Sequence, residues 1–373
     1  MSVNRLAWLD NAKMVAMICV IIGHTGGLFA NGIPGRLMGI IVGFNMPLFV
    51  LLSGFVSLGA LSRLVVFKSL TDYCEKILWR MMIPAVALSA IDQAAKGMLF
   101  ARKLWILYFF IVLLFWFVFR KPLIKEKLSK VLDKLLLFCK FVLVMFLLVS
   151  SLRLNMFWFL SMLMKLQISA ASMSYILNFT QISQKTQIVI ISLILWIGSY
   201  FVFDSWTFEM SIYYAIGLLV KQFGMIEKIC QMKFWLSAIL FIAGCILCRH
   251  FTINYGFYTS AFADLLQNGI VHIYVLRVIV ALLLSSAVIR WVFAMSRDCN
   301  WFSHAGSRSM AFYTIHALLL ATVLEGFYIE NPHNYMWIFG FLFAFAFTAI
   351  TYGIILLCER CKLTRGLVLG DWK

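Results

Sequence analysis

The sequence predicts an all-α membrane protein, a polytopic bundle of about ten to twelve transmembrane helices, and two observations lead to this fold class. Of the 373 residues, 63% are hydrophobic and only 13% are charged, a balance that soluble domains do not show. The apolar residues form repeated runs long enough to cross a bilayer as helices. The polar stretches between them are too short for a separate soluble domain, so we expect one integral membrane domain over residues 1–373.

The predicted spans follow one another with short connections. They cover about residues 13–31, 37–60, 79–99, 104–119, 135–152, 156–177, 187–203, 207–220, 234–248, 269–296, 310–328 and 335–358. The first apolar run lacks a cleavage site of small residues and another span follows it at once, so we interpret it as a retained helix and not as a signal peptide. The weakest spans are 79–99, which contains Asp92 and Lys96, and 207–220, which is short.

The net charge of +17 is explained best by membrane topology. A strongly basic soluble protein would suggest a nucleic-acid partner, whereas a polytopic protein collects its cations in cytoplasmic loops. With the N-terminus inside, most of the 32 lysines and arginines fall on the cytoplasmic side. We therefore expect an integral membrane protein with both termini in the cytoplasm, surrounded by lipid and without a nucleic-acid partner.

The nine cysteines do not suggest a metal or redox site. Two pairs have CxxC spacing, Cys245 with Cys248 and Cys358 with Cys361, but neither has a second pair of Cys or His ligands nearby. No Gly-rich phosphate loop and no internal repeat is visible. We therefore expect no bound metal.

The first span contains the most informative pair of residues. Its apolar run from Met14 to Leu28 holds a lone histidine, His24, and Lys13 precedes it by eleven residues. Eleven residues make three helical turns, so the two side chains share a face and lie about 16 Å apart along the axis. An ionisable residue at membrane depth indicates a functional site, and the alternative is a structural histidine with satisfied hydrogen bonds.

The second and third spans carry weaker signals. Pro47 removes a backbone hydrogen bond, so we expect it to kink and break the second helix, and Ser53-Gly54 follows as a small, close-packing point with a hydroxyl. At the cytoplasmic entrance of the third span, Lys76 and Arg80 are four residues apart and share a face. These two cations either hold phosphate or only set the topology.

The span 310–328 begins with a polar face. Ser309, Tyr313 and His316 follow at spacings of four and three residues, which places them on one side of a helix. Polar groups that face lipid lose the hydrogen bonds that water supplies, so they are expected to line a shared polar cavity. The residues expected to converge there are His24, Asn45, Ser53, Tyr313 and His316. Arg277, alone in a long span, is also expected to point inward.

Five segments in this order resemble the acyltransferase family 3 of integral membrane acyltransferases, with features of its fucose 4-O-acetylase-like branch. They are LDNAKMVAMICVIIGH, FNMPLFVLLSGF, RMMIP, FWFLSML and GSRSMAFYTIH, and the resemblance runs from about residue 5 to 358. The family's motifs fall on Lys13 and His24, on Ser53, Gly54 and Phe55, on Arg80 and Pro84, on Trp158, Phe159 and Leu160, and on Tyr313 and His316. Many relatives have arginine at Lys13 and histidine at Asn45.

The resemblance implies a reaction and its partners. An acyl group, usually acetyl, would pass from cytoplasmic acyl-CoA to a hydroxyl of a cell-envelope or secreted carbohydrate, at a bacterial inner membrane. Acetyl-CoA would be the donor substrate, and a glycan or a lipid-linked sugar would be the acceptor.

The resemblance also suggests roles for the motif residues. Lys13, Arg80 and Lys76 would hold CoA phosphates, and His24 would act as general base or take the acyl group covalently. The candidate donors to the developing oxyanion are Tyr313, Ser53 and Asn45, while His316 would assist or position another group.

Two other functional classes fit parts of the sequence. A transporter or flippase of a lipid-linked sugar or anion would suit kinked spans with a buried histidine, Lys165 and Arg277. A non-catalytic membrane scaffold would need none of these residues. No acidic proton-relay pair is visible within the spans, which argues against a proton-coupled transporter, and turnover of acyl-CoA separates an enzyme from both alternatives.

Overall fold

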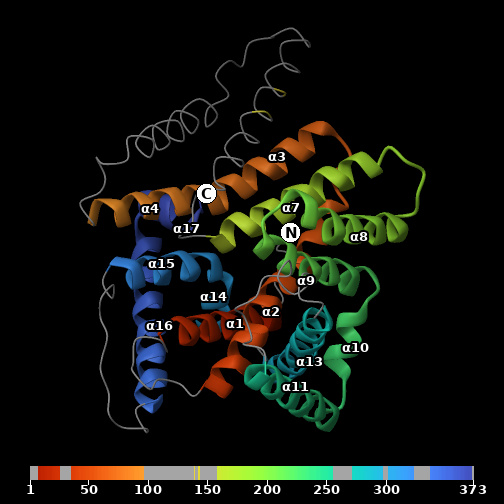
Figure 1. The fold of residues 1–373 in the computed structure, drawn as a ribbon. Helices are drawn as coiled ribbons and strands as arrows, with labels where there is room; N and C mark the ends of the chain where they lie inside the picture. The colour runs from red at the N-terminus through yellow and green to blue at the C-terminus, as the bar shows by residue number, and fades with distance from the viewer. Residues whose placement is uncertain are drawn as a thin grey trace. The chain divides into compact units, whose positions relative to one another are not determined.

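The structure, a computed structural model, describes residues 7–25, 35–95, 158–254, 271–296, 301–322 and 337–371, together with the single positions Phe138 and Val142. All regular structure in these residues is helical, which confirms the predicted all-α fold class (Figure 1). The predicted spans 104–119 and 135–152 lie outside the described residues, apart from those two positions.

The chain divides into two compact units. The first comprises Met1–Ser62, Ile176–Ser309 and Phe327–Tyr352, and the second comprises Arg63–Tyr175, Met310–Gly326 and Gly353–Lys373. The assignment of the whole chain to one domain stays a prediction.

The first unit is built mainly from long helices. They are α1 (Ala7–Thr25), α2 (Gly35–Leu61), α8 (Gln184–Val202), α9 (Ser205–Gln222), α10 (Met225–Gln231), α11 (Phe234–Asn254), α13 (His272–Met295) and the short α14 (Trp301–Ser307). Figure 1 shows α11 beside α13, and the two helices are in contact, as are α1 and α14. α16 (Trp337–Arg360) begins in this unit and ends in the second.

The second unit contains the remaining helices. They are α3 (Phe67–Ile77), a π-helical segment (Leu78–Met82), α4 (Ile83–Ala95), α7 (Trp158–Leu177), α15 (Ser309–Thr322) and α17 (Lys362–Leu369). α17 packs against α4. α3 is amphipathic, because Leu70, Cys74 and Ile77 on one face are buried whereas Lys68 and Asp72 on the other are exposed.

Six helices in the described part of the chain are long and apolar enough to cross a membrane: α1, α2, α7, α8, α13 and α16. α10 and α11 make a seventh if this pair, bent by 102°, is one span. The predicted spans 207–220 and 310–328 are helices as well, but α9 is less apolar and α15 is shorter. The described residues thus account for six or seven of the predicted spans.

The expectation that Pro47 breaks the second helix is wrong. α2 continues as one α-helix of 27 residues with Pro47 inside it. A proline removes a single ladder hydrogen bond, and in a long apolar helix whose flanking residues are buried the remaining backbone bonds keep the segment helical.

The predicted close-packing point at Ser53-Gly54 is confirmed. A Cβ atom at Gly54 would overlap the carbonyl oxygen of Tyr214 in α9, and one at Gly217 would overlap the carbonyl oxygen of Leu51 in α2. The backbones of α2 and α9 therefore touch where each helix has a glycine, as is typical of close helix crossings in membranes.

Arg277 is buried in α13, as predicted, with 6% of its surface exposed. Arg277 and Glu209, a buried carboxylate of α9, both lie near the phenol of Tyr213 in α9. A positive and a negative side chain thus lie around the same phenol between α9 and α13. This arrangement lowers the free-energy cost of burying Arg277 and Glu209.

Candidate functional site

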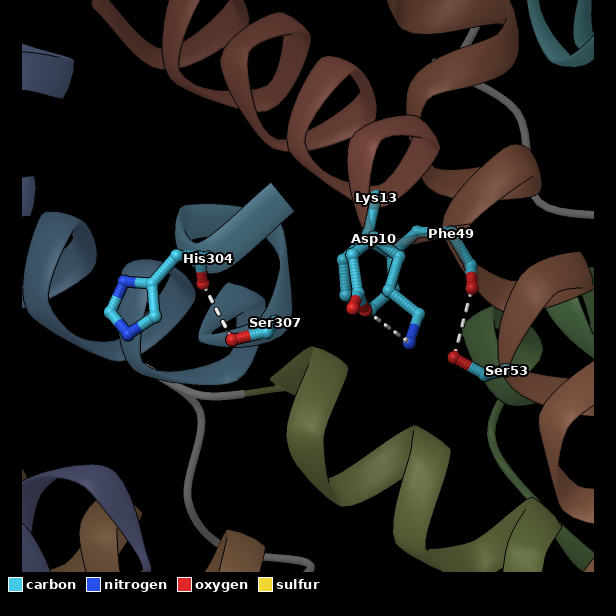
Figure 2. A network of polar contacts seen from close by, with 6 residues as sticks. All are labelled: Asp10, Lys13, Phe49, Ser53, His304 and Ser307. Atoms are coloured by element: carbon cyan, nitrogen blue, oxygen red, sulfur yellow. Dashed lines mark hydrogen bonds and ion pairs between the residues drawn. The ribbon is translucent and has the colours of Figure 1, made fainter. Parts of the chain in front are cut away.

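Lys13 lies in the first half of α1 and is held by a carboxylate one turn earlier. Its Nζ atom is 3.8 Å from Oδ1 of Asp10, whose side chain is almost fully buried (Figure 2). The sequence analysis assigned no role to Asp10, although a carboxylate three residues before a lysine is a recognisable helical ion pair. Asp10 orients the ammonium group and partly neutralises it.

Three other helices hold this end of α1 in place. A Cβ atom at Gly306 of α14 would overlap the carbonyl oxygen of Asp10, so these two backbones touch. Asn11 donates from Nδ2 to Oγ of Ser296, which ends α13, at 2.7 Å. Trp8 packs edge-on against Phe55 of α2 at 5.9 Å between ring centroids. The surroundings of Lys13 are therefore fixed by packing.

His304 lies on α14 and was missed by the sequence analysis. Its Nδ1 atom is 3.1 Å from the hydroxyl of Tyr352 in α16. Figure 2 shows the carbonyl of His304 accepting a hydrogen bond from Ser307. A single histidine outside the recognised motifs gave no sequence signal.

His24 lies in the last turn of α1 in the described part of the chain, and its side chain is exposed. The burial expected near the middle of a longer span is therefore not seen in the described residues. Ile21 and Thr25 of the same turn are buried, so His24 lies on a different face of this turn. The three turns between Lys13 and His24 are one uninterrupted helix, so their predicted spacing is confirmed.

Asn45 of α2 approaches α1 next to His24. A Cβ atom placed on Gly23 would lie 3.9 Å from Nδ2 of Asn45 and 3.9 Å from Val42. Asn45 is buried, and its Oδ1 accepts a hydrogen bond from the N–H of Met46 at 2.6 Å. No hydrogen bond from Nδ2 is seen within the described ranges, so this amide is the donor that the structure brings to the His24 end of α1.

Ser53 is buried, and its hydroxyl donates a hydrogen bond within its own helix. Its hydroxyl donates to the carbonyl of Phe49 at 2.9 Å (Figure 2). It can donate to a developing oxyanion only by giving up that bond. The next residues of the motif are structural, because Gly54 meets α9 and Phe55 packs against Trp8 with the Nζ of Lys221 4.6 Å from its ring centroid.

In the second unit, Tyr313 and His316 of α15 lie against the start of α7. The ring of Tyr313 is 5.0 Å from that of Phe159 and 5.6 Å from that of His316. The Tyr313 hydroxyl also forms a hydrogen bond with the backbone of Phe159. Phe159 lies in the first turn of α7, where backbone N–H groups have no acceptor within the helix. Two predicted motifs, Trp158-Phe159-Leu160 and Tyr313 with His316, thus meet here.

The hydrogen bond of His316 determines which of its nitrogens carries the proton. Its Nδ1 atom is 2.8 Å from the carbonyl oxygen of Phe312, and a carbonyl can only accept. Nδ1 is therefore protonated, and in the neutral ring Nε2 keeps its lone pair. His316 is completely buried, so it is suited to accept a proton or to orient a neighbour.

Lys76 and Arg80 are both exposed at the junction of α3 and α4. Arg80 lies in the π-helical segment, in which the N–H of Ile83 donates to the carbonyl of Leu78 five residues earlier. Pro84 has no N–H, so the carbonyl of Arg80 lacks its α-helical donor, which explains why the helix widens here.

The end of α17 packs against the backbone of Arg80. Gly370, with φ of +66°, ends α17, and a Cβ atom on it would lie 2.6 Å from the carbonyl oxygen and 2.9 Å from Cα of Arg80. Both the backbone conformation and the contact require glycine.

The predicted site residues are divided between the two units. Lys13, His24, Asn45 and Ser53 lie in the first unit, and Tyr313, His316, Lys76 and Arg80 lie in the second. The convergence of both groups on one cavity stays a prediction. No set of three metal-ligating side chains is found within the described residues.

Comparison with known proteins confirms the family that the sequence resembles. The family model of the acyltransferase domain of family 3 matches residues 6–358, almost the whole chain. Neither the curated proteins nor the solved structures give a significant match. Since the matched region contains the helices that carry both groups of site residues, the chain belongs to the acyltransferase family 3 of integral membrane proteins.

Proposed function

We propose that this membrane acyltransferase is an O-acetyltransferase, which moves an acetyl group from cytoplasmic acetyl-CoA to a hydroxyl of an envelope or secreted carbohydrate. One observation carries the proposal. A single uninterrupted helix, α1, holds the cation Lys13 in its first half and His24 in its last turn. These residues are about 16 Å apart along the axis, a separation that suits a long donor with phosphates at one end and a thioester at the other.

The donor phosphates are assigned to Lys13, Arg80 and Lys76. Asp10 keeps the Lys13 ammonium oriented before the donor arrives, and the phosphates replace this weak 3.8 Å ion pair. Arg80 and Lys76 are exposed and therefore accessible to a large charged ligand.

The chemical step is assigned to His24. The carbohydrate hydroxyl oxygen attacks the thioester carbonyl carbon, a C–O bond forms and the C–S bond breaks. The hydroxyl proton passes to the neutral imidazole of His24 and then to the departing CoA thiolate. Alternatively, His24 takes the acetyl group first and passes it to the hydroxyl in a second step.

Asn45 is assigned as the oxyanion donor. Its Nδ2 group lies beside Gly23, the neighbour of His24 in the chain, and makes no other hydrogen bond among the described residues. A fixed amide donor aimed at a developing oxyanion contributes about 2.7–4 kcal/mol in enzymes of known mechanism. Tyr313 and His316 form a rigid second pair that we assign to the acceptor side of the reaction.

Removing either phosphate-binding cation should weaken donor binding. Lys13→Ala and Arg80→Ala are each expected to cost about 1.5–3 kcal/mol, because each loses a charge-assisted contact with phosphate. Lys13→Arg should keep most of the affinity, since the charge remains. Calorimetric titration of the purified protein with acetyl-CoA measures the effect.

Lys228→Ala is the matched control, because Lys228 is an exposed cation on α10 outside the five motifs. Unchanged acetyl-CoA affinity in both alanine variants would show that the cations only set the topology. A protein that binds acetyl-CoA but releases no CoA thiol with any carbohydrate would contradict the transferase assignment.

The contact of Gly370 with Arg80 leads to a separate prediction. Gly370→Ala should raise the KM for acetyl-CoA severalfold with little change in kcat, because the added Cβ pushes the backbone that carries Arg80. Steady-state kinetics with varied acetyl-CoA separates the two constants.

Gly224→Ala controls for backbone strain. Gly224 also has a positive φ, +62°, but a Cβ there meets only the flexible carboxylate of Glu227 at 3.3 Å. An equal rise in KM in both variants would attribute the effect to strain and not to Arg80.

A further inference from the structure

A groove lies between the first half of α2 and the middle of α11, within the first unit. It has a volume of about 300 Å³ and is lined by Ile40, Phe241, Ile242, Cys245, Ile246 and Arg249. Its walls are almost wholly apolar apart from the single arginine. We call it the α2–α11 groove.

The walls of the α2–α11 groove are held rigidly from behind. Phe241 packs on Trp291 of α13 at 4.9 Å between ring centroids, and the indole N–H of Trp291 donates to Ser237 at 2.9 Å. A Cβ atom on Gly244 would lie 2.8 Å from Leu284, so α11 and α13 cannot move closer. The α11 wall of the groove is therefore held in place by its packing on α13.

Among the described residues that line the groove, Arg249 is the one with a charge. It is exposed, and in the part of the chain that the structure describes it forms no ion pair or hydrogen bond. It lies fifteen residues after the start of α11, about 22 Å along the helix, which is near the far side of the hydrocarbon layer from the helix start. A lipid phosphate at the membrane surface lies at the same depth and can form an ion pair with this cation.

The α2–α11 groove also lies close to the level of His24. Val42 and Asn45 of α2 face Gly23, the residue before His24. Ile40 of the groove precedes Asn45 by five residues, so the two are about 7.5 Å apart along α2. A ligand seated in the groove therefore has its polar end within reach of the level at which His24 lies.

We propose that the α2–α11 groove binds the hydrocarbon chain of a lipid-linked sugar, whose phosphate pairs with Arg249 and whose sugar hydroxyls are presented to His24. This inference rests on the proposed function and names the class of acceptor. An apolar groove gives no hydrogen bonds to a free glycan, whereas an amphiphile with one long chain and a phosphate fits both the groove and its cation.

Binding can be measured without catalysis. The purified protein in detergent is titrated with polyprenyl phosphate, and bound lipid is counted by native mass spectrometry. Arg249→Gln should weaken binding by about tenfold, the effect of losing one charge-assisted contact, and leave binding of the uncharged polyprenol unchanged. Ile246→Trp, which fills the groove, should weaken binding of both lipids.

Two matched variants and one competitor complete the test. Lys233→Gln removes an exposed cation just before the other end of α11, and Ile239→Trp enlarges an exposed residue that does not line the groove. Both should bind like the unmodified protein. Excess phosphatidylglycerol should not displace polyprenyl phosphate, and equal displacement would overturn the proposal by showing a site for bulk lipid.

The two proposals fail in different ways. Failure of polyprenyl phosphate to bind, in a protein that still acetylates a soluble sugar, overturns the lipid-linked acceptor and leaves the transferase. Binding that depends on Arg249, in a protein that never turns over acetyl-CoA, retains the lipid site and removes the transferase.

Discussion

Replacement of His24 by alanine should abolish acyl transfer and leave the fold intact. Loss of a general base lowers the rate by about 10²–10⁴-fold, and loss of a covalent acyl carrier removes the route altogether. The side chain is exposed in the last turn of α1, so its removal leaves no cavity in the core. Release of CoA thiol by the purified variant, with acetyl-CoA and a carbohydrate acceptor, measures the effect.

His272→Ala is the matched control for that variant. His272 is likewise an exposed histidine near a helix end, at the start of α13, but lies outside the motifs of the family. It should keep full activity, and His24→Ala should still bind acetyl-CoA. Normal turnover by a well-folded His24→Ala would remove both roles that are proposed for this residue.

Replacement of Gly54 by alanine should strongly destabilise the first unit. The new Cβ would overlap the backbone carbonyl of Tyr214, and a backbone atom cannot rotate away as a side chain can. Overpacking of this kind costs about 1–3 kcal/mol, and here α2 and α9 would have to separate along their crossing. Thermal unfolding in detergent, followed by the accessibility of buried thiols, reports the loss.

Gly59→Ala provides the comparison on the same helix. A Cβ atom at Gly59 meets nothing within 4 Å, so alanine there should be neutral or stabilise α2 by about 0.5–1 kcal/mol. Gly217→Ala, on the α9 side of the crossing, should behave like Gly54→Ala. Equal stability of the Gly54 and Gly59 variants would show that the two backbones are not in contact.

Glycine in the Ser-Gly-Phe motif is therefore explained by packing. Ser53 bonds to its own helix, Gly54 touches α9 and Phe55 packs on Trp8. The motif builds the wall beside α1, and we expect its substitution to act through the positions of Lys13 and Asn45.

The sequence by itself determined the fold class, the spacing of Lys13 and His24 and the helical nature of the spans that fall in the described ranges. These are local properties. Hydropathy over some twenty residues decides whether a segment can cross a bilayer, and 1.5 Å per residue fixes distances along a helix. The small contact at Gly54 was also predictable, because close helix crossings in membranes need small residues.

Only the tertiary structure decided which backbones meet. The contact of Gly306 with Asp10, the contact of Gly370 with Arg80 and the α2–α11 groove each join segments that are far apart in sequence. The continuity of α2 through Pro47 and the exposure of His24 depend on the same kind of information. Such features arise from the mutual packing of whole helices, and hydropathy and periodicity record only which face of each helix is apolar.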